Sequence, residues 1–406
     1  KEILMRIRAM SDLKNLLHFL RLLVLRNRKK SFEKVRSVRF ITFRRFFPDG
    51  GAGGGGAVQS ANRVLFGSEL NGVSLKYSFY EDNRFSTDRK NELWDLFGAV
   101  EFVRLKTKDD RETAYITHDY GSAFGLYLAG KKYVLVSHIQ GARIEEKINF
   151  GEKFTFVSRK IIQASEKLAF AHALCVCFPS EGAYDYFAGS RYKIIRSGQF
   201  KKGRVLYNTL YATGNMLPVS GITQDDSCVT FLSVGQLTKA KGLDRNPLFL
   251  EAFLKKTAGK VRYIMVGKGP LEAAVKTELD RLSGLYDNFS YIHLKGCSYA
   301  EMQYLQNITD VYLMLHRISI FDLTTLEMMN KSKCVVLSDV GGNPEFNRDD
   351  NIILVKNDDY EAGSSALLGS DIKMLGNKNK RVYEKYFSNR NFAESYGAVL
   401  EELLGD

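Results

Sequence analysis

A glycine-rich loop follows the first strand-like segment of this 406-residue sequence, residues 38–43. Glycine occupies positions 50, 51 and 53–56, and a helix-like segment comes next. Glycines let backbone N–H groups approach a ligand closely, and the start of a helix favours an anion. The loop lacks the Gly-Lys-Ser/Thr of a P-loop, and its glycines are too clustered for a dinucleotide fingerprint. Its position after a strand favours an anion-binding loop over a merely flexible one.

A lysine occurs in the loop after another strand-like segment, residues 229–234. Lys241 stands directly before Gly242 and Leu243, where a helix is expected to begin. A lysine at this point could neutralise the charge that develops on a diphosphate leaving group. Loop lysines are commonly just solvated, so this motif needs support from others.

Such support comes from the segment that follows the strand-like residues 311–315. A helix beginning near Leu323 would direct its free N–H groups at a phosphate. Glu327, one turn further, could accept hydrogen bonds from ribose hydroxyls, although it could instead be a surface carboxylate near the helix dipole. Two similar strand-to-helix turns, 266–270 and 338–345, suggest that several strand ends of one sheet carry ligand-binding loops.

Strand-like and helix-like patterns alternate from about residue 35, which predicts parallel sheets covered by helices on both faces. Open sheets of this kind bind ligands beyond the carboxyl ends of their strands. A polar, turn-rich stretch at 212–227 is expected to link two such α/β lobes, with a cleft between them. The expected strands are 38–43, 73–80, 100–105, 115–117, 133–137, 174–178, 229–234, 262–266, 289–294, 311–315 and 335–337, and the expected helices include 58–70, 152–173 and 380–404.

Together these motifs resemble the retaining glycosyltransferases of the GT-B fold, family 4 (glycosyl transferases group 1), most closely between Thr230 and Val355. The glycine loop and the segments 117–119 and 136–138 are similar to N-terminal parts of that family. The resemblance implies an α/β GT-B fold in which two Rossmann-like lobes face an interdomain cleft. The expected parts are a basic amphipathic helix at 1–34, an acceptor lobe at 35–211, a linker at 212–227, a nucleotide-sugar lobe at 228–378, and a C-terminal helix at 379–406 that packs back on the N-terminal lobe.

The resemblance also implies roles for residues at matching positions. Lys241 looks like the lysine that grips the donor diphosphate, and Glu327 like the second glutamate of a Glu-x7-Glu motif that holds the ribose. The backbone amides of Leu323 and Thr324 would meet the distal phosphate, and His138 would lie near the transferred sugar. The expected catalytic residues are Lys241, His138 and Glu327, and the expected donor-binding residues are Gly53, Gly54, Gly55, Gln236, Gly267, Ser319, Phe321, Asp322, Leu323, Thr324 and Glu327.

Two positions depart from the family pattern. Ser319 stands where the first glutamate of Glu-x7-Glu is expected, and Gln236 stands where the family usually has arginine. The neutral pair suggests either an unusual donor sugar with fewer hydroxyls or a weakened or inactive enzyme. The retained Lys241, Glu327 and glycine loops favour activity.

The expected function is therefore hexosyl or deoxyhexosyl transfer from a nucleoside-diphosphate donor, UDP rather than GDP or dTDP, to a saccharide acceptor in surface polysaccharide or glycoconjugate biosynthesis. The acceptor is expected to be lipid-linked. The alternative is a non-catalytic GT-B subunit that binds a glycan or a partner transferase, and a GT-B phosphorylase or epimerase fits less well. The resemblance implies that no metal or other cofactor is bound. The sequence agrees with this, because it shows no Asp-x-Asp triplet and its five scattered cysteines complete no metal site.

Positive charge is concentrated at the N-terminus, where residues 1–45 contain 14 Lys/Arg and 3 Asp/Glu and the whole chain carries +13. The same region has no uncharged run long enough to span a bilayer and no signal-peptide cleavage site. Its apolar residues recur at helical spacing and are Leu13, Leu16, Leu17, Leu20 and Val24.

This pattern predicts that residues 1–34 lie on an anionic membrane surface. An ordinary amphipathic helix packed on the protein is the alternative. Nucleic-acid binding is not expected, since no recognised binding motif accompanies the basic stretch. The cysteine usage favours a reducing compartment, so the expected location is cytoplasmic and peripheral on the inner face of the cell membrane.

Overall fold

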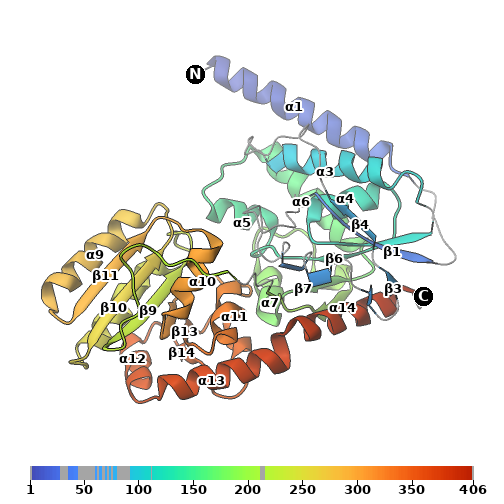
Figure 1. Cartoon of the computed structure of the whole chain (residues 1–406). Coiled ribbons are helices and arrows are strands. Elements are labelled where there is room, and N and C mark those ends of the chain that lie inside the picture. The colour runs from blue at the N-terminus through green and yellow to red at the C-terminus, as the bar shows by residue number, and fades with distance from the viewer. Residues whose placement is uncertain are drawn as a thin grey trace. The chain divides into compact units, whose positions relative to one another are not determined.

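A computed structural model shows that the chain divides into two compact units, residues 1–208 with 392–406, and residues 209–391. Each unit is built on one parallel six-stranded sheet (Figure 1). The expected α/β class with two parallel sheets is thus confirmed. The residues that the structure describes are 2–27, 35–43, 60–61, 64–65, 69–70, 73–74, 76–79, 92–110, 112–210 and 215–404.

The sheet of the first unit has the strand order β4-β1-β5-β6-β7-β8, and a separate antiparallel pair is formed by β2 and β3. The chain runs from β1 to β4 on one side and then places β5 on the other side of β1, so the order reverses between β1 and β5. The strands are β1 Ser37–Thr42, β2 Glu69–Leu70, β3 Val73–Ser74, β4 Lys76–Phe79, β5 Thr113–Thr117, β6 Tyr133–Val136, β7 Val176–Phe178 and β8 Lys202–Val205.

Helices cover the first sheet, and the last of them comes from the far end of the chain. Residues of α14 from Phe392 onward belong to the first unit, and Tyr396 and Leu400 are buried in its core against strand residues such as Phe40 and Val136. The helices of this unit are α1 Glu2–Val24, α3 Glu92–Lys106, α4 Tyr120–Leu128, α5 Arg143–Asn149, α6 Phe156–Ala171, α7 Glu181–Gly189 and α14 Asn389–Leu404. No helix in the described part of the chain is long and apolar enough to cross a bilayer.

The second sheet has the order β11-β10-β9-β12-β13-β14, and every pair in it is parallel. Strands β10 and β11 lie on one side of β9 and the later strands on the other, so the order reverses between β9 and β12. The elements are β9 Cys228–Val234, α8 Asn246–Leu254, β10 Lys260–Val266, α9 Glu272–Leu285, β11 Phe289–Leu294, α10 Tyr299–Asn307, β12 Val311–Met314, α11 Leu323–Asn330, β13 Cys334–Ser338, β14 Ile353–Val355, α12 Tyr360–Leu368 and α13 Ile372–Val382.

One expected strand is wrong: residues 100–105 lie inside α3. Leu93, Leu96, Val100 and Val103 are all buried and recur every three or four residues, which is the period of a helix. A six-residue window cannot separate this pattern from that of a buried strand.

The expected elements also differ from the structure at their ends. The helix predicted for 58–70 cannot reach Leu70, because Glu69–Leu70 is β2. The predicted helix 380–404 is interrupted by a π-helical turn at Tyr383–Phe387 before α14 begins. The short strands β8 and β14 were not expected, because three or four residues at a sheet edge give little periodic signal.

The observed boundary between the units falls at 208/209, whereas the sequence suggests a linker at 212–227. The described residues of that stretch pack within the second unit. Leu217 N donates to the carbonyl oxygen of Ala300 over 3.1 Å, and the guanidinium of Arg262 donates to the carbonyl oxygen of Thr223 over 2.8 Å. These contacts make the stretch part of the unit.

A buried ionic cluster joins α3, α5 and α6 of the first unit. Arg143 bonds both carboxylate oxygens of Glu92, Nε to Oε1 over 2.7 Å and Nη2 to Oε2 over 2.9 Å, and Lys147 lies 3.2 Å from Glu92. The Glu92 side chain is only 1% exposed. Although burial opposes it, the charge of Arg143 lowers the pKa of Glu92 to about 2. Burial raises the pKa of the neighbouring Glu166 to about 8, and its carboxyl accepts from Arg143 N over 2.8 Å.

Candidate functional site

The loops of the second unit converge at the carboxyl edge of its sheet, where the strand order reverses between β9 and β12. Open α/β sheets bind ligands at such a reversal. The loop after β9 contacts the loop after β12 directly, since the amides of Arg317 and Ile318 donate to the carbonyl oxygen of Ala240 over 3.0 and 3.1 Å. Lys241 is therefore held beside the loop that leads into α11.

Two glycines make this close packing possible. Gly242 has φ +68°, and a Cβ atom there would lie 1.9 Å from the carbonyl oxygen of Leu315. Gly267 has φ +145°, and its Cβ would lie 1.9 Å from the carbonyl oxygen of Gly235. Neither position has room for a side chain. In this structure Gly267, one of the expected donor-binding residues, allows the loop after β10 to contact the loop after β9.

The helix α11 begins at Leu323, as the sequence predicts. Asp322 is its N-cap: the Oδ2 atom accepts from Thr325 N over 3.0 Å and from the Tyr312 hydroxyl over 3.0 Å. The backbone N–H groups of Leu323 and Thr324 donate to no other residue that the structure describes. Two backbone donors at a helix N-terminus thus remain for an anion, and their contact with a phosphate stays a prediction.

Lys241 lies at the same N-terminus. Its Nζ atom is 3.6 Å from Oδ1 of Asp322, and the Lys241 side chain is 32% exposed whereas that of Asp322 is 8% exposed. Burial tends to raise the pKa of Asp322, but the charge of Lys241 and hydrogen bonds from its neighbours lower it below its ordinary value. The carboxylate is therefore ionised at neutral pH, and a phosphate that enters would compete with it for Lys241.

His316, which no sequence motif indicates, lies beside this pair. Its Nε2 atom is 3.7 Å from Oδ1 of Asp322, and neither ring nitrogen hydrogen-bonds to any described residue. Burial, with the nearby charge of Lys241, lowers the pKa of His316 to about 4, so the ring is neutral. His316 could have been predicted from its position, because it lies two residues after the buried strand β12, in the loop that leads to α11.

Glu327 is not a solvated surface carboxylate. It is partly buried, and its Oε2 atom accepts from Nε2 of Gln306 over 2.5 Å. Burial raises the pKa of Glu327 to about 7, so the side chain is partly protonated near neutral pH. Glu327 stays the predicted acceptor of ribose hydroxyls.

The remaining expected residues of this unit are placed differently. Phe321 is buried and stacks on Phe346 at 4.3 Å between ring centroids, so its side chain packs against protein. Ser319 is buried, and its carbonyl oxygen accepts from Gly342 N over 3.0 Å. Gln236 is exposed. The structure thus groups Lys241, Asp322, Leu323 and Thr324, with Glu327 on the same helix.

In the first unit, His138 follows β6 and is partly buried, and it belongs to a chain of polar groups whose other members are buried. Its Nε2 atom lies 2.9 Å from Nδ1 of His118, which follows β5. The Nε2 atom of His118 in turn lies 2.5 Å from the hydroxyl of Tyr396 on α14. Burial lowers the pKa of His138 to about 4, and burial together with His138 lowers the pKa of His118 well below its ordinary value.

The expected glycines Gly53, Gly54 and Gly55 lie outside the described residues. The start of their loop is fixed, however, because Oδ2 of Asp119 accepts from Phe43 N over 3.2 Å and from the Thr42 hydroxyl over 3.0 Å. Asp119 also caps α4 by accepting from Ser122 N over 2.7 Å. It thereby ties the end of β1 to the loop after β5, where the strand order of the first sheet reverses.

Among the described residues, no group of three or more His, Cys, Asp or Glu side chains could hold a metal ion. All five cysteines are free thiols.

Comparison with known proteins finds a family model that matches part of the second unit and solved structures that share the fold of most of the chain. The family model described as glycosyl transferases group 1 matches residues 228–369, which contain the whole Lys241 and α11 site. No curated protein matches the chain.

Among solved structures, sucrose-phosphate synthase from Thermosynechococcus elongatus is similar with a TM-score of 0.63 at 15% identity, covering 91% of this chain and 100% of that chain. A structure described as trehalose-6-phosphate from E. coli bound with UDP-2-fluoro glucose has a TM-score of 0.62 at 14% identity, with coverages of 91% and 99%. An S. aureus TarM mutant in complex with Fondaparinux, alpha-GlcNAc-glycerol and UDP has a TM-score of 0.53 at 15% identity, with coverages of 74% and 58%. At these identities the likeness establishes the fold, which is GT-B.

Proposed function

We propose that this chain is a retaining family 4 glycosyltransferase. Its GT-B fold, its match to glycosyl transferases group 1 over residues 228–369 and the site described above support the proposal. The observation that carries the proposal is the grouping of Lys241 with the amides of Leu323 and Thr324, at the reversal point of the second sheet. Neither amide has a partner among the residues that the structure describes. A cation and a helix N-terminus together favour a diphosphate. UDP is the preferred nucleotide, and two of the similar structures contain UDP or a UDP-sugar.

In the proposed reaction, an acceptor hydroxyl bonds to the anomeric carbon on the face from which the diphosphate leaves, so the configuration is retained. The transition state is oxocarbenium-like, and negative charge develops on the departing phosphate oxygen. Lys241 and the N-terminus of α11 would stabilise that charge. Glu327 would hold the ribose, and the reaction needs no protein nucleophile.

A second candidate is a non-catalytic GT-B subunit that binds a glycan or a partner transferase. The ionised carboxylate of Asp322 favours it, because it already pairs with Lys241 where a phosphate would have to bind. The neutral residues Ser319 and Gln236 point the same way. The two candidates differ in one cheap observable, which is nucleotide binding.

The nucleotide test is a thermal-shift comparison of UDP, GDP, dTDP and CDP on the full chain. A ligand at a hundredfold excess over its Kd stabilises the folded state by about 2.7 kcal/mol, so UDP should raise Tm clearly and the other nucleotides less. A preference for GDP or dTDP would correct the donor. No shift with any of the four would reject the transferase and favour the non-catalytic subunit.

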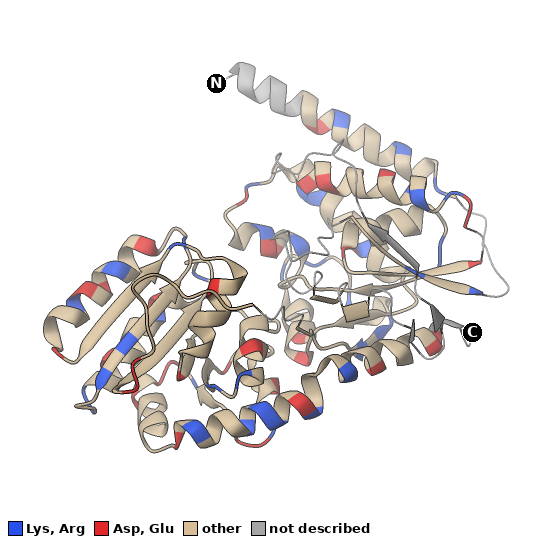
Figure 2. Cartoon of the chain, in the orientation of Figure 1, with Lys and Arg blue, Asp and Glu red and all other residues tan. Residues whose placement is uncertain are grey.

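The exposed face of α1 is the reason to propose a membrane-bound acceptor. One face of this helix packs on the first unit, where Phe19 stacks on Phe124 and Leu22 is buried. Figure 1 shows α1 lying along α3. The other face exposes an apolar stripe with basic Lys14 and Arg21 beside it, and Figure 2 shows the basic positions along α1. The stripe consists of Met10, Leu13, Leu17, Leu20 and Val24, which are 47–78% exposed; Leu16, expected on this face, is partly buried.

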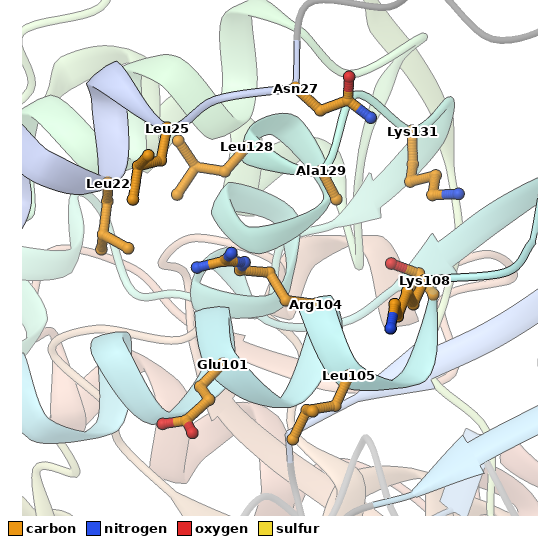
Figure 3. A pocket seen from close by; sticks show the side chains of 11 residues that line it. Leu22, Leu25, Asn27, Glu101, Arg104, Leu105, Lys108, Leu128, Ala129 and Lys131 are labelled. Carbon is orange, nitrogen blue, oxygen red and sulfur yellow. The ribbon is translucent and has the colours of Figure 1, made fainter.

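A pocket of about 490 Å³ opens at the C-terminal end of α1 (Figure 3). Apolar and basic side chains line it together, so it suits the phosphate of a lipid headgroup next to an acyl chain; a single carboxylate, Glu101, opposes this. The lining includes Leu22, Leu25, Leu105, Leu128, Arg104, Lys108 and Lys131. The stripe and the pocket support a peripheral location on the inner face of the cell membrane and a lipid-linked saccharide acceptor in surface polysaccharide or glycoconjugate biosynthesis.

Changing Leu13, Leu17 and Leu20 together to glutamine should reduce flotation with vesicles of phosphatidylcholine and phosphatidylglycerol at least tenfold. Each leucine contributes roughly 1.5–3 kcal/mol when buried in an apolar phase. The control changes three exposed leucines of the second unit, Leu248, Leu285 and Leu368, in the same way, and should float like the unaltered chain. Equal flotation of both triple variants would remove the reason to propose a membrane acceptor.

A further inference from the structure

Three side chains connect the C-terminal helix of the chain to His138. The hydroxyl of Tyr396 lies 2.5 Å from Nε2 of His118, and Nδ1 of His118 lies 2.9 Å from Nε2 of His138. Tyr396 and His118 are 1% and 4% exposed. The Tyr396–His118 hydrogen bond is buried and the His118–His138 bond is partly buried. The directions of both bonds can be worked out from donor and acceptor chemistry.

Both rings are neutral at physiological pH, since burial lowers the pKa of each histidine. A neutral imidazole carries one N–H donor and one acceptor nitrogen. A phenol is a good donor and a poor acceptor, whereas an unprotonated ring nitrogen is a strong acceptor. The preferred direction therefore has the Tyr396 hydroxyl donating to Nε2 of His118, which leaves the His118 proton on Nδ1.

The same argument gives the tautomer of the second ring, His138. Nδ1–H of His118 donates to Nε2 of His138, so the single proton of His138 must be on Nδ1. This Nδ1 atom is buried and hydrogen-bonds to no described residue. A buried polar group without a partner destabilises the folded state. The arrangement thus leaves one donor that the described residues do not satisfy.

We propose that Tyr396 is a positioning residue that acts through His118 to fix the tautomer of His138, so that Nδ1–H of His138 donates to a hydroxyl oxygen of the transferred sugar. His138 is then a hydrogen-bond donor and not a general base. The identity of the ligand rests on the proposed function. The tautomer does not, because it is a property of the protein without ligand.

Packing alone does not explain why residue 396 is a tyrosine and not a phenylalanine. Its ring stacks on His118 at 5.9 Å between centroids and contacts Phe392 at 4.6 Å. A phenylalanine at 396 would keep both ring contacts and lose only the hydroxyl. The variant Tyr396→Phe therefore separates positioning from packing.

The test is nitrogen NMR of the full chain labelled with ¹⁵N-histidine, without any donor, in the unaltered protein and in Tyr396→Phe. With six histidines in the sequence, His118→Gln and His138→Gln assign the two rings. We expect His118 protonated on Nδ1 and His138 protonated on Nδ1 in the unaltered chain. In Tyr396→Phe both rings should become mixtures of tautomers.

The matched control is Tyr133→Phe. Tyr133 lies on β6, the strand that precedes His138, is fully buried and donates to the carbonyl oxygen of Ala169 over 2.7 Å. Its loss should lower stability to a similar degree and leave both histidine tautomers unchanged. Where transfer can be measured, kcat of Tyr396→Phe should fall roughly tenfold with the donor KM unchanged, since one hydrogen bond contributes about 0.5–1.5 kcal/mol.

A His138 ring protonated on Nε2 in the unaltered chain would overturn the proposal, even if Tyr396→Phe did not fold. Unchanged tautomers in a folded Tyr396→Phe would also overturn it. If instead the tautomers shift as expected but the chain binds no nucleotide, the positioning role of Tyr396 is supported and the proposed function fails.

Discussion

Replacing Lys241 with alanine should lower the rate of sugar transfer by about 10²–10³-fold, the usual effect of removing one group that stabilises charge in a transition state. Lys241 Nζ lies at the N-terminus of α11, beside two backbone donors that have no partner among the described residues. The charge on the leaving phosphate is larger in the transition state than in the bound donor. The loss should therefore fall mainly on kcat, as measured in a transfer assay with saturating donor.

Lys239→Ala is the control for this change. Lys239 is exposed in the same loop, two residues earlier, and its backbone carbonyl, which the substitution keeps, accepts from Arg317. This variant should keep nearly full activity. A Lys241→Ala enzyme as active as the Lys239→Ala enzyme would remove Lys241 from the mechanism.

Replacing Arg143 with methionine should lower the free energy of unfolding of the first unit by roughly 3–5 kcal/mol, the penalty for leaving a buried charge without its partner. Arg143 is the bidentate partner of Glu92, whose side chain is 1% exposed. Lys147, 3.2 Å away, compensates only part of that charge. Urea unfolding followed by circular dichroism measures the change.

Arg281→Met serves as the comparison at the surface. Arg281 bonds Glu251 and Glu278 on α8 and α9, and its side chain is 43% exposed. Exposed ion pairs contribute about 0–1 kcal/mol, so this variant should unfold almost like the unaltered chain. Equal effects of the two substitutions would show that the cluster around Arg143 is not buried in solution.

The free energy of unfolding at acidic pH gives a second test of the role of Arg143. The pKa of Glu92 is about 2 in the folded state against an ordinary value of 4.5, so its stabilising contribution is present above pH 4.5 and disappears as the pH falls towards 2. Glu166 acts oppositely: its folded pKa of about 8 means that its penalty grows as the pH rises from about 4.5 to 8. The difference between the unaltered chain and Arg143→Met should therefore shrink below pH 4.

The sequence was sufficient for the repeating parts of the fold and for the position of the loops that follow β9 and β12. Buried strands such as Val311–Met314 and the start of α11 at Leu323 could be predicted because apolar runs and turn residues are local signals. The strand expected at 100–105 failed because a helix buried on most sides has the same composition in a short window.

The residues that the sequence did not reveal act through distant contacts. Tyr396 reaches His118 across 278 positions of the chain, so no spacing could connect them. His316 belongs to no sequence motif. Only its burial beside Lys241 and Asp322 shows that it is part of the site. The competition of Asp322 for Lys241 was equally hidden, because the side-chain direction of an N-cap is set by the helix it caps.

The placement of residues 392–406 in the first unit affects the order in which the protein can fold during synthesis. The second unit, residues 209–391, is continuous and can fold once it has left the ribosome. The first unit must wait, because Tyr396, Val399 and Leu400 complete its core. At translation rates of about 5–20 residues per second, its core stays incomplete for roughly 10–40 s. During that interval the earliest-made half of the chain is the part most exposed to chaperones.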